Sequence, residues 1–237
     1  MTEKIYLSEA YAKEFEGTVK VVSGPAVILD RTVFFPSGGG QPFDTGILTS
    51  EKGEFKVIET KKEGDDVVHI LDHESGLLQG ANVHGKIDWE KRYIHMRLHT
   101  AIHIIDGIVE KRNQGSITGG QIYDDRARVD FDIPGMDRQT VETMIGEAQK
   151  IVDAGYKVYP KTFMKEEALK MENLSRTEPG RELMRQLDEV RVIVIEGFDM
   201  QMDGGTHVSS TKEVGKISLF KYENKGSHNK RIEIKLE

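Results

Sequence analysis

The strongest constraint on the fold is an abrupt change in hydrophobic period at DWEKRY, residues 88–93. Before it lie short runs rich in β-branched residues, separated by Gly, Ser, Asp or Lys-Glu-Gly turns. These runs are GTVKVVS, AVILDRTVFF, GILTS, EFKVIET, DVVHIL and ANVHGKID. Strands at such regular spacing predict a small barrel or sandwich. From Glu90 to about Asn113, apolar residues recur every three or four positions, which predicts a helix.

The remainder of the chain alternates between strand and helix patterns. ARVDFDI and YKVYPKTF are typical of strands, as are EVRVIVIEG, GKISLFKYE and KRIEIKLE; EVRVIVIEG is expected to be buried. Residues 136–155 predict a helix capped by Asp137 and stopped by Gly155, and KEEALKME and GRELMRQL predict two short helices. The expected class is α+β. A small β-barrel domain over residues 1–88 precedes an α/β core over 89–237, whose mostly antiparallel sheet packs against helices.

Composition limits the chemistry and the compartment. The 237 residues include no cysteine, which excludes disulfides, thiol catalysis and thiolate metal ligands. A metal would need histidine and carboxylate ligands, which suit zinc and also manganese, iron or nickel. Apolar runs of about six residues are far short of a membrane span. The charged N-terminus lacks a secretory core, so a cytoplasmic protein without membrane contact is expected.

The net charge of −7 argues mildly against a nucleic-acid binder, which usually carries a basic face. Charge is uneven, however, and residues 212–237 hold seven basic and four acidic side chains. The basic ones are Lys212, Lys216, Lys221, Lys225, Lys230, Arg231 and Lys235. A solvated β-hairpin is the preferred interpretation, and a strip that contacts phosphates is the alternative.

Three histidines recur at intervals of four on the predicted helix: His95, His99 and His103. Residues four apart drift by only about 40° around a helix, so they share one face. A pair at this spacing suits a single metal ion, although such pairs also occur on helix surfaces and in polar pockets. His69 and His73 have the same spacing on a predicted strand, where four residues span about 13 Å. We assign that pair no ligand role.

Two glycine-containing turns complete the set of candidate motifs. In DGGTH, Gly204 and Gly205 allow a tight turn that brings Asp203 and His207 toward a common centre. The alternative is a simple turn in which Asp203 caps the backbone. FFPSGGGQPFDTG offers backbone amides to a ligand, but it lacks the lysine and the spacing of a nucleotide P-loop. It is either a flexible hairpin or, as its phenylalanines and prolines favour, an ordered loop.

Together these motifs resemble the editing domain of alanyl-tRNA synthetase, and most closely its freestanding relatives, the AlaX trans-editing proteins. The order is the same: GGGQ and DTG in a β domain, HTAIH on a helix, NQGSITGG leading to ARVDFD, and late in the chain VRVIVIEGFDMQMDGGTHVSSTKEVGKI. The resemblance covers nearly the whole chain. The N-terminal β domain, with nothing after the core, is typical of the medium-length class.

The resemblance implies hydrolysis of mischarged tRNA(Ala), chiefly seryl-tRNA(Ala), with glycyl-tRNA(Ala) as a further substrate to test. It implies one zinc ion per chain, held by two helix histidines and by a cysteine and a histidine of the late motif. Carried over by position, the ligands are His99, His103, Asp203 and His207. Asp203 replaces the cysteine of many relatives. A carboxylate oxygen is a legitimate zinc ligand, but it makes the site less selective for zinc, so another divalent metal is possible.

Direct ligation by Asp203 is preferred, with a carboxylate that only hydrogen-bonds a ligand as the alternative. Gln114, in the polar wall of the relatives' pocket, and Thr206 are the candidate catalytic residues. Ile102 occupies a position that is threonine in the synthetase domains. The resemblance links the glycine-rich loop to substrate choice, so the candidate substrate-binding residues are Gly38, Gly39, Gly40 and Gln41.

Two other functions fit the same residues. One is a metal-dependent hydrolase or oxygenase of small molecules, which would have no affinity for tRNA. The other is a non-catalytic tRNA- or protein-binding module that holds no stoichiometric metal. The net charge of −7 fits both of these functions better than it fits an enzyme that acts on RNA. A monomer and a homodimer both fit these patterns.

Overall fold

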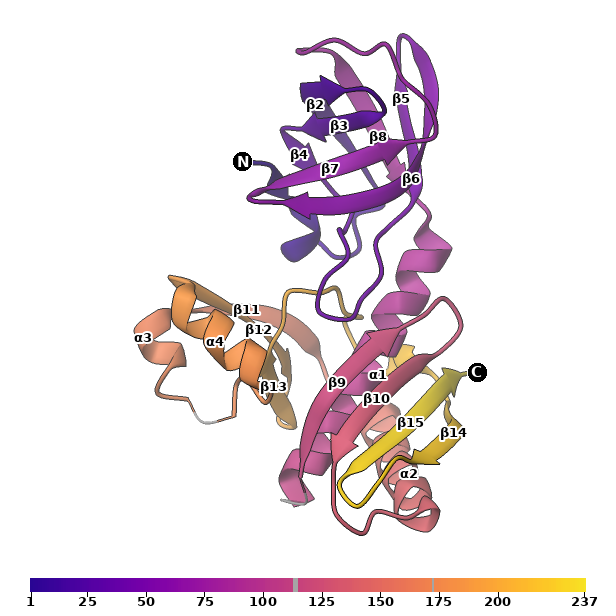
Figure 1. Ribbon diagram of the computed structural model, residues 1–237, viewed down its shortest axis with the longest axis vertical. Helices are drawn as coiled ribbons and strands as arrows, with labels where there is room; N and C mark the ends of the chain where they lie inside the picture. The colour runs from indigo at the N-terminus through magenta and orange to yellow at the C-terminus, as the bar shows by residue number, and fades with distance from the viewer. Residues whose placement is uncertain (113–114, 172) are drawn as a thin grey trace. The chain divides into compact units, whose positions relative to one another are not determined.

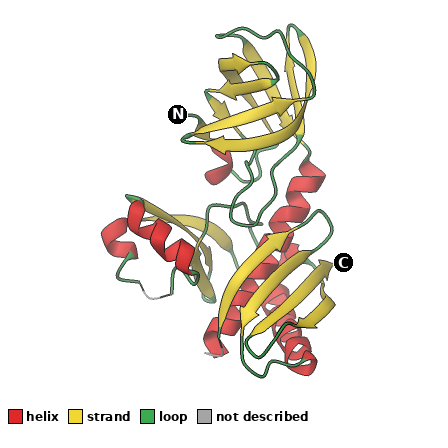
Figure 2. Ribbon diagram, in the orientation of Figure 1, coloured by secondary structure: helices red, strands yellow, loops and turns green. Residues whose placement is uncertain are grey.

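The computed structural model describes residues 1–112, 115–171 and 173–237, which form two compact units, Met1–Tyr93 and Ile94–Glu237. The boundary between the units lies within helix α1 (Trp89–Arg112). A closed β-barrel, further antiparallel sheets and helices make up the chain (Figure 2). This arrangement confirms the predicted α+β class.

The first unit is built around a six-stranded barrel of antiparallel neighbours in the order β2-β3-β7-β6-β5-β8 (Figure 1). The strands are β2 (Glu14–Ser23), β3 (Ala26–Leu29), β5 (Gly46–Ser50), β6 (Gly53–Glu63), β7 (Asp66–Leu71) and β8 (Asn82–Ile87). Alternate residues of these strands point inward, as in the burial of Val27 and Leu29 on β3, and they form one apolar core. Of the two architectures expected, the barrel is the one observed.

The run AVILDRTVFF is two strands and not the single strand predicted. It is divided at Asp30 into β3 and β4 (Arg31–Thr32). The Asp30 carboxylate accepts the Thr18 N–H at 2.7 Å, while β4 leaves the barrel to pair in parallel with β1 (Glu3–Lys4). A short helix, η1 (Ile5–Leu7), follows β1. The strand therefore stops where the Asp30 side chain hydrogen-bonds to the backbone of β2.

The glycine-rich loop is ordered around a two-residue turn. Gly38 and Gln41 exchange two backbone hydrogen bonds, of 3.1 and 2.9 Å, across Gly39 and Gly40. Both central residues have positive φ, +59° and +83°, as a type I′ hairpin turn requires and as glycine allows without strain. Gly38 and Gly39 are exposed and Gln41 is buried.

A buried ion pair holds the two ends of this loop. Arg92 and Asp44 have no exposed side-chain surface, and Nε of Arg92 lies 3.0 Å from both carboxylate oxygens. Arg92 also donates to the Val33 carbonyl at 2.6 Å. Asp44 accepts the Phe35 N–H at 2.6 Å. One guanidinium thus contacts residues that precede and follow the glycines.

His69, on β7, is completely buried inside the first unit. One ring nitrogen lies 2.8 Å from the Thr32 hydroxyl and the other 3.2 Å from the Val27 carbonyl. Burial lowers the pKa of His69 to about 4, against a smaller opposing effect of the Val27 carbonyl. His73, four residues on, is exposed and lies beside Asp72.

We expect the stability of the first unit to fall between pH 6.5 and 4 because of His69. In this window the unfolded chain binds a proton at His69 and the folded chain does not, so acidification favours unfolding. A difference of this size corresponds to about 3 kcal/mol. The difference in unfolding free energy between the wild type and His69→Gln should therefore change by that amount across the window. Urea unfolding followed by fluorescence of Trp89, the sole tryptophan, measures it, since Trp89 packs against the barrel core. Parallel pH profiles for the two proteins would contradict the assignment.

The described residues of the second unit form two antiparallel sheets, where a single sheet was expected. One has the order β14-β15-β10-β9 and the other β11-β12-β13. The first consists of β9 (Ser116–Ile122), β10 (Ala127–Asp132), β14 (Ile217–Asn224) and β15 (Asn229–Leu236), and the second of β11 (Val158–Met164), β12 (Glu189–Ile195) and β13 (Asp199–Met202). Neither β9 nor β13 was predicted as a strand. The prediction that EVRVIVIEG is buried is confirmed, because β12 is the central strand of its sheet.

The helices of the second unit cover these sheets. Helix α2 (Arg138–Ala154) packs against β14 and, with α1, lies behind the four-stranded sheet in Figure 1. Its predicted ends are confirmed: Asp137 accepts the Thr140 N–H at 2.8 Å, and Gly155 closes the helix with φ of +67°. Helices α3 (Lys165–Ala168) and α4 (Glu178–Gln186) share an apolar cluster with β11 and β12. The pattern KEEALKME overestimated the length of α3.

The C-terminal basic segment forms the expected hairpin, β14–β15. Its cations lie next to acids: Arg231 donates to both oxygens of Asp130, at 2.5 and 2.9 Å, and Lys221 lies 2.7 Å from Glu223. Lys230, on β15, is buried, and its ammonium group donates to the Asn224 side chain at 2.9 Å and to the Ser227 carbonyl at 3.1 Å. This pairing favours the solvated hairpin over a strip that contacts phosphates.

No helix within the described residues is both long and apolar enough to cross a membrane.

Candidate metal centre

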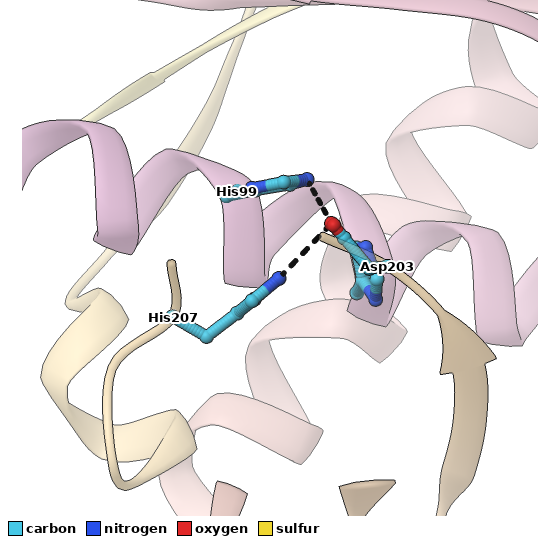
Figure 3. Close-up of side chains that lie close together, drawn as sticks. His99, Asp203 and His207 are labelled. Atoms are coloured by element: carbon cyan, nitrogen blue, oxygen red, sulfur yellow. Dashed lines mark ion pairs between the residues drawn. The ribbon is translucent and has the colours of Figure 1, made fainter. Parts of the chain in front are cut away.

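Four side chains from two distant motifs converge in the second unit. Among the residues that the structure describes, His99, His103, Asp203 and His207 form a group in which one ligand atom from each lies within 4.8 Å of all the others. Nε2 of His99 lies 3.3 Å from the Asp203 carboxylate, and Nε2 of His207 lies 3.7 Å from it. Figure 3 shows both imidazoles directed toward Asp203. The ring centroids of His99 and His103 are 5.1 Å apart. The ring centroid of His207 lies 4.3 Å from that of His99 and 4.5 Å from that of His103.

Helix α1 supplies two members of the group one turn apart. His99 and His103 lie on the same helix face, as their spacing predicts, and both are more than nine-tenths buried. His95, one turn earlier, is fully buried but belongs to a different contact, with its Nε2 2.8 Å from Asp124. The spacing of four residues therefore includes one histidine, His95, that is not a member of the group.

The other two members lie in the turn after β13, the strand that pairs with β12. The Asp203 N–H donates to the Arg191 carbonyl at 3.2 Å, and Arg191 donates back to the Asp203 carbonyl at 2.8 Å. The Asp203 carboxylate accepts the Gly205 N–H at 3.1 and 2.9 Å. Asp203 thus caps the turn, and its carboxylate also faces His99 and His207. Its role as a metal ligand stays a prediction.

The electrostatics of the group suit a cation at neutral pH. Burial lowers the pKa of His99 to about 4, and burial also lowers the pKa values of His103 and His207. Burial alone would raise the pKa of the Asp203 carboxyl, but the imidazoles of His99, His207 and His103 outweigh it and hold that pKa well below its usual range. The group therefore presents three uncharged imidazoles and one carboxylate.

This donor set fits a divalent cation. Nε2 of His207 is buried and has no hydrogen-bond partner among the described residues, although buried polar atoms are rarely left unpaired. A metal ion would satisfy that lone pair, and nitrogen and carboxylate oxygen are ordinary ligands of first-row divalent metals. No thiolate is present, since the chain has no cysteine.

Two residues that support the group were not singled out from the sequence. The Thr100 hydroxyl lies 3.1 Å from Nδ1 of His207, and Gln201 donates to the His103 carbonyl at 3.0 Å and to Asp199 at 2.5 Å. Their positions in the sequence, close to the predicted ligands, could have indicated both residues. Thr100 lies between the two helix ligands in the sequence, and Gln201 lies two residues before Asp203.

The other predicted site residues are more scattered. Thr206 is completely buried beside His207. Gln114 lies outside the described residues. Ile102 is partly buried on α1. The glycine-rich loop, Gly38 to Gln41, belongs to the first unit. The catalytic and substrate-binding roles of these residues stay predictions.

Comparison with known proteins places both ends of the chain among domains associated with tRNA synthetases. Residues 2–91 match the family model described as tRNA synthetases class II (A). Residues 190–233, which include Asp203 and His207, match the model described as the threonyl and alanyl tRNA synthetase second additional domain. The chain is also 34% identical over 225 residues to the alanine–tRNA ligase of Metallosphaera sedula, covering 94% of this chain and 25% of the ligase.

The similarity to freestanding editing proteins is greater and extends over both chains. The alanyl-tRNA editing protein AlaX-M of Saccharolobus solfataricus is 42% identical over 236 residues, which is 98% of each chain. That of Methanosarcina barkeri is 41% identical over 239 residues, again 98% of each. The chain belongs to the AlaX-M family of alanyl-tRNA editing proteins, which confirms the resemblance seen in its motifs.

Proposed function

We propose that this chain is a trans-editing hydrolase that removes serine from mischarged tRNA(Ala), with a zinc ion held by His99, His103, Asp203 and His207. Near-full-length identity of 42% to an alanyl-tRNA editing protein supports an aminoacyl-tRNA deacylase that acts in alanyl-tRNA editing. The convergence of the four side chains is the observation that carries the metal-dependent mechanism. Because the substrate is a charged tRNA, the cytoplasm is the expected compartment.

The reaction breaks the ester between an amino acid and the terminal ribose of the tRNA. This ester is already activated, so the protein must place a water, orient the ester and stabilise developing negative charge. A divalent cation held by the four side chains would supply Lewis-acid chemistry, as a water activator or as an anchor for the substrate. Asp203 reduces the net charge of the occupied site, and the buried imidazoles keep their lone pairs available at neutral pH.

Discrimination between serine and alanine has a physical basis. A synthetic site sized for alanine cannot strongly reject an amino acid that adds one hydroxyl, because an apolar pocket discriminates only about 10²-fold. A second site that hydrogen-bonds the hydroxyl rejects the analogue lacking it by about 10⁴-fold or more, since its own polar groups are then left unpaired. A cation held by the four side chains, together with the buried polar side chains around it, would supply partners for the serine hydroxyl.

We expect this protein to deacylate seryl-tRNA(Ala) about 10⁴-fold faster, in kcat/KM, than alanyl-tRNA(Ala). A deacylation time course with radiolabelled seryl-, glycyl- and alanyl-tRNA(Ala) measures the difference, and glycyl-tRNA(Ala) tests whether the hydroxyl is required. Equal rates on serine and alanine, or no turnover of either by metal-loaded protein, would refute the proposed substrate. Binding of uncharged tRNA(Ala) at two salt concentrations provides a second measurement, because phosphate contacts weaken steeply with salt. A small-molecule hydrolase would show no such binding.

A further inference from the structure

We propose that Thr100 is a positioning residue for the metal centre, whose hydroxyl lets His207 change tautomer and present Nε2 to the cation. This inference rests on the metal site of the proposed function but not on the proposed substrate. Thr100 follows His99 on α1 and is completely buried. Its Oγ1 lies 3.1 Å from Nδ1 of His207, which comes from the other motif, 107 residues away in sequence.

The hydrogen bonds around Thr100 restrict what its hydroxyl can do. The Val208 N–H donates to Oγ1 of Thr100 at 3.3 Å. A threonine hydroxyl has one hydrogen and two lone pairs, so this bond leaves one lone pair and the hydrogen. Nδ1 of His207 can therefore donate to the remaining lone pair or accept the hydrogen. The same atom fixes the ring of His207 and the backbone of the next residue.

A neutral imidazole carries one N–H and one lone pair, so the Thr100 contact is coupled to the chemistry at Nε2. If Nδ1 donates to Oγ1, the lone pair of His207 is on Nε2, the atom that is buried without a hydrogen-bond partner in the group. If the hydroxyl instead donates to Nδ1, the hydrogen is on Nε2, which faces the Asp203 carboxylate at 3.7 Å. The first state binds a cation, and the second suits the site without one.

A hydroxyl can serve both states by rotation, whereas a group that only donates or only accepts serves one of them. Metal-binding histidines generally donate their second ring N–H to a fixed acceptor, which sets the tautomer and the ring orientation. Here that acceptor lies on the helix that supplies two of the ligands. The segment HTAIH thus provides His99, His103 and the support for His207, and it couples the two motifs through a contact that needs no metal.

The test is the zinc affinity of the full chain carrying Thr100→Val or Thr100→Ser. Valine keeps the shape and removes the hydroxyl, so zinc should bind about 10- to 100-fold more weakly. Serine keeps the hydroxyl, so Thr100→Ser should bind zinc within about threefold of the wild-type affinity, a much smaller change than that expected for Thr100→Val. Thr143→Val is the matched control, since it removes an exposed helix hydroxyl that donates to the Gln139 carbonyl at 2.9 Å. Affinity is measured by competition with a chromophoric chelator.

A spectroscopic measurement on the wild type covers the case in which Thr100→Val does not fold. Two-dimensional ¹H–¹⁵N spectra of the histidine side chains report the tautomer of each neutral ring. We expect His207 to be protonated on Nδ1 in the zinc-loaded protein. Protonation on Nε2 with zinc bound, or a Thr100→Val variant that binds zinc as tightly as wild type, would overturn the proposal. A wild type that binds zinc but spares seryl-tRNA(Ala) would refute the substrate alone, and the affinity comparison would still decide the role of Thr100.

Discussion

His99→Ala and His103→Ala should each abolish stoichiometric metal binding and lower kcat/KM for seryl-tRNA(Ala) by about 10³-fold or more. Each substitution removes one of three imidazoles from a group whose members lie within 4.8 Å of one another. Charge stabilisation by a bound cation contributes several kcal/mol to such reactions, and each 1.36 kcal/mol corresponds to a factor of ten. Metal content by elemental analysis and single-turnover deacylation measure the two losses on the same samples.

Two further variants separate loss of the metal from general damage. His73→Ala removes an exposed histidine that lies beside Asp72, so both metal content and rate should stay at wild-type values. Asp203→Ala should weaken metal binding and leave partial activity, because three imidazoles remain. Full metal content in His99→Ala or His103→Ala would show that the group is not the metal site. Full content in Asp203→Ala would show that the carboxylate only caps the turn, as its bond to Gly205 allows.

The half of the site carried by α1 was predictable from local geometry, and the other half was not. A spacing of four on a helix is enough to put His99 and His103 on one face. That Asp203 and His207 meet them depends on contacts between residues about a hundred positions apart, which no local period encodes. Only the resemblance to the editing family linked the two motifs. The second ring contact of His207, with Thr100, could not be read from either motif alone.

The fold shows the same division between local and long-range information. Alternation and turn residues predicted the barrel strands, and Asp137 and Gly155 predicted both ends of α2. The split of the run AVILDRTVFF at Asp30 was missed, since it depends on a bond to Thr18 of another strand. The strand β9 was missed because SITGGQI contains two glycines, which weaken a strand pattern. In these cases hydrogen bonding to another strand overrode local propensity.

Arg92→Met should destabilise the first unit by about 3–5 kcal/mol, the range found when one partner of a buried ion pair is removed. Arg92 and Asp44 have no exposed side-chain surface, so the substitution leaves a buried carboxylate without its cation. It also removes donors to the Val33 carbonyl at 2.6 Å and the Ala10 carbonyl at 3.2 Å. Urea unfolding followed by Trp89 fluorescence measures the loss, because Trp89 packs against the barrel core.

A surface ion pair of the same barrel provides the control. Lys86 lies 3.0 Å from Glu14, with 61% and 46% of the two side chains exposed, so Lys86→Met should change the unfolding free energy far less than Arg92→Met. The double variant Asp44→Leu with Arg92→Met should regain part of the loss, since no buried charge is then unpaired. Recovery should be incomplete, because the Val33 carbonyl and the Phe35 N–H lose their side-chain partners. Equal costs for Arg92→Met and Lys86→Met would show that this pair contributes no more than an exposed one.

The position of the Arg92–Asp44 ion pair, at the ends of the glycine-rich loop, also predicts an effect on function. Val33 precedes the turn of Gly39 and Gly40, and Asp44 follows it, so Arg92 holds both ends of the glycine-rich loop from the base of α1. If the loop contributes to substrate choice, partial release of its ends should reduce discrimination between seryl- and alanyl-tRNA(Ala) before it reduces metal binding. Metal content should remain at the wild-type level in Arg92→Met under conditions where the first unit is still folded, because all four candidate ligands belong to the second unit.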